Sequence, residues 1–137
     1  MPQARVSQAL SEYIGQGHKW ILGGARGVDQ YALEYLVAKG ERVMVIVPNT
    51  IQAQPKVFRS FYERTRDAWA KHSAVLELKD SSFPYPSAYH ARNRAMVDRA
   101  ELVIGFPHGD GGAANTIAYA IKKGKTVRVI QSEGGTE

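Results

Sequence analysis

The chain has 137 residues, of which 44% are hydrophobic and 23% are charged, and its formal net charge is +5. This length and composition are typical of one globular domain with its own core. The absence of cysteine excludes a disulfide scaffold, a thiol nucleophile and a thiolate metal site, and a cytoplasmic location is expected. The positive charge favours ligands that carry phosphate, and no apolar stretch predicts a signal peptide or a membrane span.

Hydrophobic periodicity predicts strands that alternate with helices along the chain. Helices are predicted at about residues 4–15, 28–39, 56–72, 88–99 and 113–123, where apolar positions recur at the helical period. Strands are predicted at residues 20–22, 42–47, 74–78, 101–106 and 126–130. Residues 1–130 are therefore expected to form a single domain, and the polar residues 131–137 a C-terminal tail.

This alternation predicts the class of fold. The strand at residues 42–47 is a nearly continuous β-branched run, which indicates a strand covered on both faces. We expect an α/β fold, a three-layer Rossmann-like sandwich with a mostly parallel sheet of about five strands and helices on both faces. Ligands of such sheets bind at the carboxyl ends of the strands.

A glycine-rich turn follows the first predicted strand and leads into a helix. Gly23, Gly24 and Gly27 allow close backbone approach, and the N–H groups of the following helix attract anions. Arg26 adds positive charge, and all four residues are predicted to bind a ligand. Asp29 stabilises the helix N-terminus, and we expect it to neutralise Arg26 or to accept a hydrogen bond from a sugar hydroxyl.

A second glycine-rich turn follows the fourth predicted strand and again precedes a helix. Two helix N-termini at one crevice suit a phosphate or a diphosphate, and therefore a nucleotide. Neither turn matches the dinucleotide fingerprint or the P-loop. Because Asp29 would repel phosphate, we expect phosphate nearer the second turn. The predicted ligand-binding residues of that turn are Gly109, Asp110, Gly111, Gly112, Asn115 and Thr116.

Two further candidate residues lie on the helix before the fourth strand. Arg92 could clamp a phosphate through two hydrogen bonds, and Asn93 could donate to a ribose or a base. On the residues alone, a structural role for this pair is about equally supported. Arg94 is instead expected to pair with Asp98 on a solvated face. The histidines are scattered and predict no metal site, and no catalytic residue stands out.

Three motifs in order, Gly23–Asp29, Arg92–Met96 and Phe106–Thr116, resemble those of the SLOG superfamily. This superfamily includes the DNA-processing protein DprA (Smf), the YspA-like proteins and the LOG (Lonely Guy, "lysine decarboxylase-like") phosphoribohydrolases. The resemblance covers about residues 4–130 and implies a Rossmann-like fold, nucleotide-derived ligands or single-stranded DNA, and often a dimer. The YspA-like pattern G-T-A-D-T-I is the most similar, at Gly112–Ile117.

The chain also departs from these relatives. LOG enzymes carry a turn that resembles P-G-G-x-G-T-x-x-E, and their catalytic glutamate would fall on Thr116 and their catalytic arginine on Arg92. Hydrolysis would then need a displaced carboxylate, from Asp110 or Asp29. Such proteins usually open with a strand, so either the sheet is one strand short or an upstream segment is missing.

These observations lead to one expectation and two alternatives. We expect a domain that binds a nucleotide or a nucleotide-derived ligand, with phosphate held by the two glycine-rich turns, in a homodimer without a metal or a membrane partner. The first alternative is DprA-like binding or processing of single-stranded DNA. The second is a LOG-like nucleotide phosphoribohydrolase with a displaced carboxylate.

Overall fold

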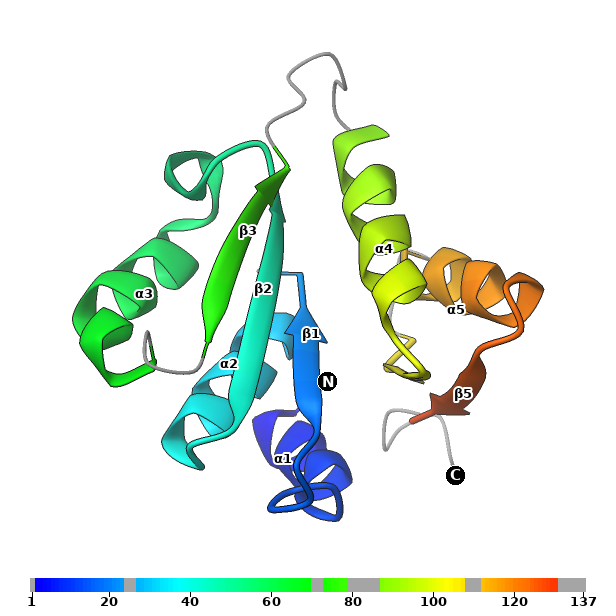
Figure 1. The fold of residues 1–137 in the computed structure, drawn as a ribbon, viewed down its shortest axis with the longest axis horizontal. Coiled ribbons are helices and arrows are strands. Elements are labelled where there is room, and N and C mark those ends of the chain that lie inside the picture. The colour runs from blue at the N-terminus through cyan, green and yellow to red at the C-terminus, as the bar shows by residue number, and fades with distance from the viewer. Residues whose placement is uncertain (1, 24–26, 70–72, 79–86, 108–111, 131–137) are drawn as a thin grey trace.

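A computed structural model of the chain describes residues 2–23, 27–69, 73–78, 87–107 and 112–130. Helices and strands alternate along these residues (Figure 1). The α-helices are α1 (Gln3–Ser11), α2 (Val28–Ala38), α3 (Lys56–Trp69), α4 (Ser87–Arg99) and α5 (Gly112–Lys122), and Ile51–Ala53 form the 3-10 helix η1. The strands are β1 (Lys19–Leu22), β2 (Arg42–Pro48), β3 (Ala74–Leu78), β4 (Leu102–Gly105) and β5 (Thr126–Val129).

The order of these elements confirms the order predicted from hydrophobic periodicity. The largest difference is at the end of the first helix, which stops at Ser11 because residues 12–15 form a turn. The short helix η1 lies between β2 and α3, where no helix or strand was predicted. In the described part of the chain, no helix has the length and apolar character needed to cross a membrane.

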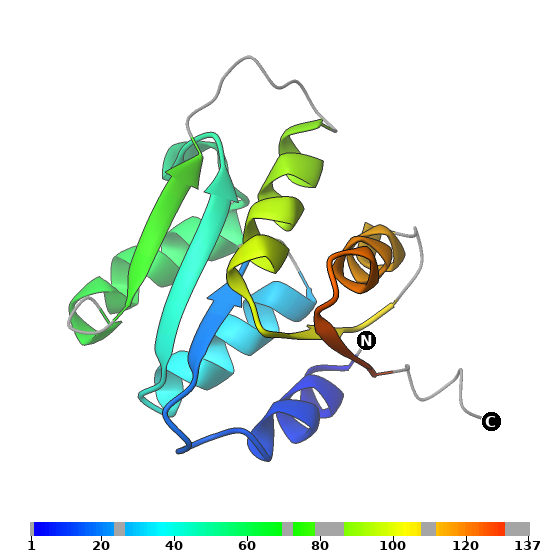
Figure 2. The same cartoon turned by 45° about the vertical axis from the view of Figure 1, so that its right-hand side comes forward.

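The strands form two parallel sheets rather than one. The first sheet has the order β1-β2-β3 and the second is the pair β4-β5. The expectation of one continuous sheet of about five strands is therefore not confirmed. Figure 2 shows the two sheets turned relative to each other. Both β1 and β4 line a common cavity. In the described residues, no hydrogen-bonded ladder joins these two strands.

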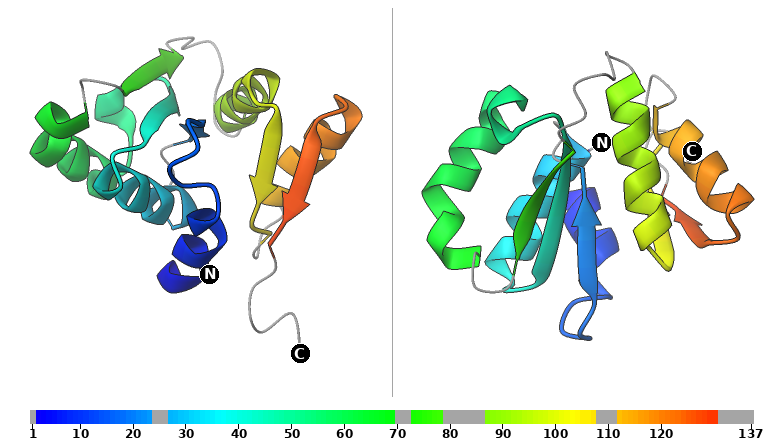
Figure 3. Two further views of the ribbon diagram at one scale, coloured as in Figure 1. Left: turned by 60° about the horizontal axis from the view of Figure 1, so that its bottom comes forward. Right: turned by 45° about the horizontal axis from the view of Figure 1, so that its top comes forward.

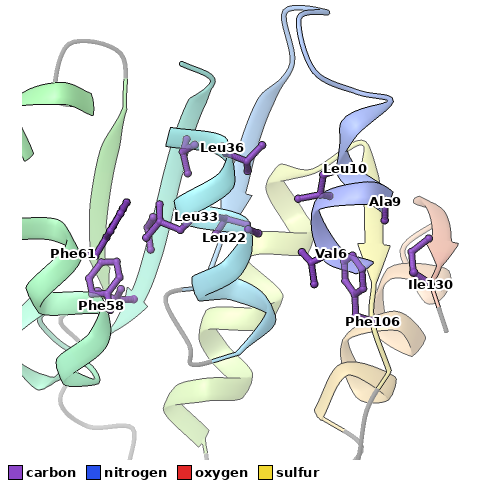
Figure 4. Close-up of a cluster of buried hydrophobic side chains, with 14 residues drawn as sticks. Val6, Ala9, Leu10, Leu22, Leu33, Leu36, Phe58, Phe61, Phe106 and Ile130 are labelled. Atoms are coloured by element: carbon purple, nitrogen blue, oxygen red, sulfur yellow. The ribbon is translucent and has the colours of Figure 1, made fainter. Parts of the chain in front are cut away.

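Helices cover both faces of the three-stranded sheet. Val43, Val45 and Val47 of β2 belong to the main buried cluster, which also contains residues of α1, α2 and α3 (Figure 4). Side chains alternate between the faces of a strand. Ile46 of β2 and Val97 of α4 are therefore buried on the other face, where α4 packs against β2. Burial on both faces explains why β2 is apolar throughout.

Helix α1 connects the two sheets. Figure 4 shows its residue Val6 beside Phe106, which follows β4, and its residue Ala9 facing Ile130, which follows β5. At the other end of α1, the guanidinium of Arg128 in β5 pairs with Glu12. The two-stranded sheet is thus attached to the rest of the domain through apolar packing and an ion pair.

Candidate functional site at the carboxyl ends of the strands

The candidate site is built around a contact between α4 and the end of β1. Arg92 is only 6% exposed, and its Nη1 atom donates a hydrogen bond to the carbonyl oxygen of Gly23. Its Nε atom donates to Oδ1 of Asn93 at 2.7 Å. A buried guanidinium is tolerated where hydrogen bonds replace those lost from water. These bonds therefore fix Arg92 at the carboxyl end of the three-stranded sheet.

The residue at position 23 must be glycine for this arrangement to exist. A Cβ atom built on Gly23 would lie 2.7 Å from Nη1 of Arg92 and 2.9 Å from Oδ2 of Asp29. Gly27, directly before α2, has a φ of 77°, a backbone conformation that residues other than glycine rarely adopt. The steric constraints at Gly23 and Gly27 therefore favour glycine at both positions. Because Gly23 has no side chain, the guanidinium of Arg92 and the carboxylate of Asp29 can both lie close to its backbone.

A cavity of about 1660 Å³ lies between the two sheets, and its lining runs from Lys19 and Glu101 at the amino ends of β1 and β4 to residues at their carboxyl ends. Its lining includes five residues that the sequence predicted for the site: Gly27, Asp29, Arg92, Asn93 and Thr116. They come from α2 and the residue before it, from α4 and from α5, so folding brings together segments that are far apart in the sequence.

The other predicted site residues have different outcomes. Asn115 is exposed on α5 and is not in the described lining of the cavity, and Gly112 is the first residue of α5. Gly24, Arg26, Gly109, Asp110 and Gly111 lie outside the described residues. The role of the two turns as a phosphate cradle therefore stays a prediction, and so does the proposed pairing of Arg26 with Asp29.

The structure adds basic residues that the sequence reasoning did not assign to the site. Lys56 and Arg59, in the first turn of α3, line the same cavity, and Nε of Arg59 donates to the carbonyl oxygen of Gln54 at 3.0 Å. The Gln54 side chain is buried and donates to the carbonyl oxygens of Pro48 and Thr50 at 2.5 and 2.7 Å. The sequence could have indicated these residues, because Lys56 and Arg59 follow the strand β2. The segment after a parallel strand begins at the same edge of the sheet as the first glycine-rich turn.

Arg94 has a different environment from Arg92. Its guanidinium carbon lies 5.7 Å from the ring centroid of Tyr119 in α5, and Arg94 is exposed. The Tyr119 hydroxyl donates to Oδ1 of Asp98 at 2.8 Å, and this hydrogen bond raises the pKa of Tyr119 above its ordinary value of 10.0. The exposure of Arg94 agrees with its predicted place on a solvated face. Its predicted ion pair with Asp98 is not found in the part of the chain that the structure describes, where Asp98 accepts from Tyr119 instead.

The lining of the cavity combines apolar residues with basic and hydrogen-bonding side chains. The basic residues of its lining are Lys19, Lys56, Arg59, Arg92 and Arg99, the carboxylates are Asp29 and Glu101, and His90 of α4 also lines it. Among the described residues, no group of three histidine, aspartate or glutamate side chains is placed to hold a metal ion. The cavity is therefore suited to an anionic ligand that also carries hydrogen-bonding groups.

Comparison with known proteins identifies a family for this chain. The family model described as DNA recombination-mediator protein A matches residues 2–135, which is nearly the whole chain. A search of curated proteins finds no match. The matching family lies within the SLOG/Rossmann-like superfamily that the three motifs resemble, and the parallel α/β architecture fits it. The chain therefore belongs to the DNA recombination-mediator protein A family.

Proposed function

We propose that this domain binds single-stranded DNA at the cavity beside Gly23. The observation that carries the proposal is that Lys56, Arg59 and Arg92, from two separate helices, line one cavity, which Arg92 borders at the carboxyl end of β1. Cations that contact phosphates supply most of the affinity for a nucleic acid strand. Membership of a family described as a DNA recombination mediator favours a DNA strand as the ligand.

The cavity residues have distinct roles in this proposal. Lys56 and Arg59 attract backbone phosphates, and Arg92 is held in place by its bond to Gly23. Asp29 repels phosphate from its own surroundings and so directs the strand toward the cations. Asn93 and Thr116 offer hydrogen-bonding groups to a sugar or a base. Backbone N–H groups of the two glycine-rich turns, with Arg26, would add further anion contacts.

A free nucleotide is the second candidate ligand. The cavity combines basic side chains with the amide of Asn93 and the hydroxyl of Thr116, and this mixture suits a single nucleotide as well as one unit of a strand. The YspA-like resemblance of Gly112–Ile117 belongs with this candidate. A phosphoribohydrolase that uses Asp29 would be recognised by release of free base from nucleoside monophosphates, a release that Asp29→Asn would abolish.

The test compares Arg92→Gln with Arg94→Gln in binding to a fluorescent oligothymidylate, measured by anisotropy. Both variants lose one positive charge from α4, but only Arg92 lines the cavity. We expect roughly tenfold weaker binding for Arg92→Gln, equivalent to about 1.4 kcal/mol, and less than about twofold for Arg94→Gln. Affinity should fall steadily as salt is added.

Three results would separate the candidates. Equal losses in the two variants would mean that binding depends only on net charge and not on this cavity. If no oligonucleotide binds at low salt but nucleoside monophosphates raise the melting temperature, the free nucleotide is the ligand. Melting curves of both variants without ligand show whether Arg92→Gln has altered the fold rather than the binding surface.

A further inference from the structure

The loop between β2 and α3 is held in one conformation by the strand beside it. The backbone N–H of Asn49 donates to the carbonyl oxygen of Leu78 in β3 at 2.9 Å, and that of Ile51 donates to Oε2 of Glu77 at 2.7 Å. Asn49 has a φ of 61°, in the left-handed region that asparagine tolerates better than most residues. β3 therefore fixes the segment that leads from the carboxyl end of β2 into η1.

Gln54, near the end of this loop, has a buried side chain that bonds back to the start of the loop. The residue is 6% exposed, and its Nε2 atom donates to the carbonyl oxygens of Pro48 and Thr50. These two bonds use both hydrogens of the amide nitrogen. A buried polar group whose hydrogen bonds are formed makes its surroundings rigid, and the loss of its partners is costly. The Gln54 side chain is therefore placed to set the shape of the loop.

The backbone of Gln54 also binds the guanidinium of Arg59. The Nε atom of Arg59 donates to the carbonyl oxygen of Gln54 at 3.0 Å, and the residue lines the cavity. In the part of the chain that the structure describes, this guanidinium forms no other hydrogen bond and no ion pair. Its terminal atoms Nη1 and Nη2 therefore remain for a ligand. Such a planar pair of donors matches two oxygens of one phosphate.

Arg92 is used differently. Its Nη1 and Nε atoms already donate within the protein, to Gly23 and Asn93. In both views of Figure 3, α3 and α4 lie on opposite sides of the three-stranded sheet, so the two arginines approach the cavity from opposite faces. Of the two, Arg59 is the one whose terminal nitrogens suit a phosphate contact through two hydrogen bonds.

We propose that Gln54 is a positioning residue of the candidate site, which holds Arg59 so that Nη1 and Nη2 bind two oxygens of one phosphate. This inference rests on the proposed function, because the phosphate belongs to the strand or nucleotide that the cavity binds. It adds that the contact depends on the geometry of the guanidinium as well as on its charge. Arg59→Lys would keep the charge but lose the planar pair of donors.

The test measures affinity for the fluorescent oligothymidylate in Arg59→Lys, with Arg66→Lys as the matched control. Both substitutions keep the charge of α3, but Arg66 is exposed and is not in the described lining of the cavity. We expect roughly fivefold weaker binding for Arg59→Lys and less than about twofold for Arg66→Lys. Undiminished affinity in Arg59→Lys would overturn the proposal.

The role of Gln54 is tested by repeating the comparison in Gln54→Met, which has a side chain of similar length but no amide. This variant alone should weaken binding, and in its background Arg59→Lys should cost less than about twofold, because the guanidinium is no longer held. An equal loss from Arg59→Lys in both backgrounds would overturn the proposal. If Gln54→Met does not fold, Glu77→Ala replaces it, since it removes the acceptor of the Ile51 amide.

A measurement without DNA separates this inference from the proposed function. The Nε–H signal of Arg59 in a heteronuclear NMR spectrum is identified by its absence in Arg59→Lys. Its exchange with water should be at least roughly fivefold faster in Gln54→Met than in the unaltered protein. Equal exchange rates would overturn the positioning role.

The same signal decides the case in which no oligothymidylate binds. If the exchange depends on Gln54 but DNA does not bind, the proposed DNA binding fails, and thymidine monophosphate becomes the probe, with binding measured by the rise in melting temperature. A smaller rise in Arg59→Lys than in Arg66→Lys supports the proposal. Equal rises, or no rise in any variant, would overturn it.

Discussion

The two sheets of this domain differ in how completely their strands are used. In the three-stranded sheet, β2 has a strand on both sides, and Val43, Val45, Ile46 and Val47 are at most 1% exposed. In the two-stranded sheet, β5 is partly exposed, with Val129 at 42%. Two strands alone are marginally stable in water, so the second sheet depends on helices packed against it. The three-stranded sheet therefore supplies most of the core, whereas the stability of the two-stranded sheet depends on its contacts with the neighbouring helices.

The candidate site takes residues from both regions. Gly23 and Asp29 belong to the part that contains the three-stranded sheet, and Thr116 belongs to α5 beside the two-stranded sheet. Arg92 lies on α4, which packs against both β2 and α5. The affinity for a ligand therefore depends on the relative placement of the two regions, whereas the free energy of unfolding depends mainly on the core. The following predictions separate these two properties, beginning with the largest expected effect.

Truncation in the core should distinguish the regions most strongly. Leu36 in α2 is 0% exposed within the main cluster, so Leu36→Ala leaves a cavity and should lower the free energy of unfolding by about 2–5 kcal/mol. Val129→Ala in β5 removes a partly exposed side chain and should change it by less than about 0.5 kcal/mol. Urea denaturation measures both values, and similar losses would contradict the proposed difference between the sheets.

Glycine-to-alanine substitutions should separate binding from stability. In Gly23→Ala the new methyl group meets Arg92 and Asp29, so we expect a loss of about 1–3 kcal/mol in stability together with weaker DNA binding. In Gly105→Ala the methyl group meets Cδ1 of Ile117 at 2.5 Å, which lowers stability but leaves the cations of the cavity in place. Chemical denaturation and oligonucleotide anisotropy are the two measurements. Normal DNA affinity in Gly23→Ala would disprove its role in holding Arg92.

Amide hydrogen exchange should show the same contrast without mutation. The amides of β2 are enclosed on both faces and both edges, so they should exchange only when the whole domain unfolds. The amides of β4 and β5 should exchange sooner, through local opening of the smaller sheet. Mild denaturant should accelerate exchange of β2 more than that of β4, because global opening exposes more surface. Equal protection of the two sheets would show that they open as one unit.

The smallest effect concerns the contact between α4 and α5. The hydrogen bond to Asp98 raises the pKa of Tyr119, so Asp98→Asn should lower it toward the ordinary value. The neutral phenol donates this bond, so its contribution to stability is present below the unfolded pKa of about 10 and is lost as the pH rises through the higher folded pKa. Ultraviolet titration at 295 nm, with Tyr119→Phe subtracted, isolates this residue. If the pKa of Tyr119 is unchanged in Asp98→Asn, the hydrogen bond to Asp98 is not the cause of its raised value.

The sequence predicted the local structure well because the signals are local. The β-branched run of β2 and the helical spacing of Phe58 and Phe61 both mark buried positions, and the structure confirms each of them. The SLOG superfamily was also accessible, through three short motifs in a fixed order, whereas the family within it was identified by the family model. The YspA-like branch and the phosphate-binding role of the turns stay predictions.

The relation between distant segments could not be predicted in the same way. Nothing in the residues of β1 or β4 indicates whether the two strands are neighbours, because that depends on what lies between them in space. The approach of Arg92 to Gly23 joins residues 69 positions apart, and the inclusion of Arg59 in the cavity depends on how α3 is placed. The sequence supported a structural role and a ligand-binding role for Arg92 about equally. Both interpretations are reasonable, because Arg92 forms a hydrogen bond to Gly23 and also lines the cavity.

The contact between Arg92 and Gly23 has a consequence for the order of folding. Contacts between residues distant in sequence require closure of a long loop, and they form after local helices and strand pairs. The pairing of Glu12 with Arg128 spans 116 positions and has the same requirement. We expect both contacts to form late in refolding, after β1, β2 and β3 have paired. The binding site would then be absent from early intermediates, and a ligand that binds it would select chains that have completed folding.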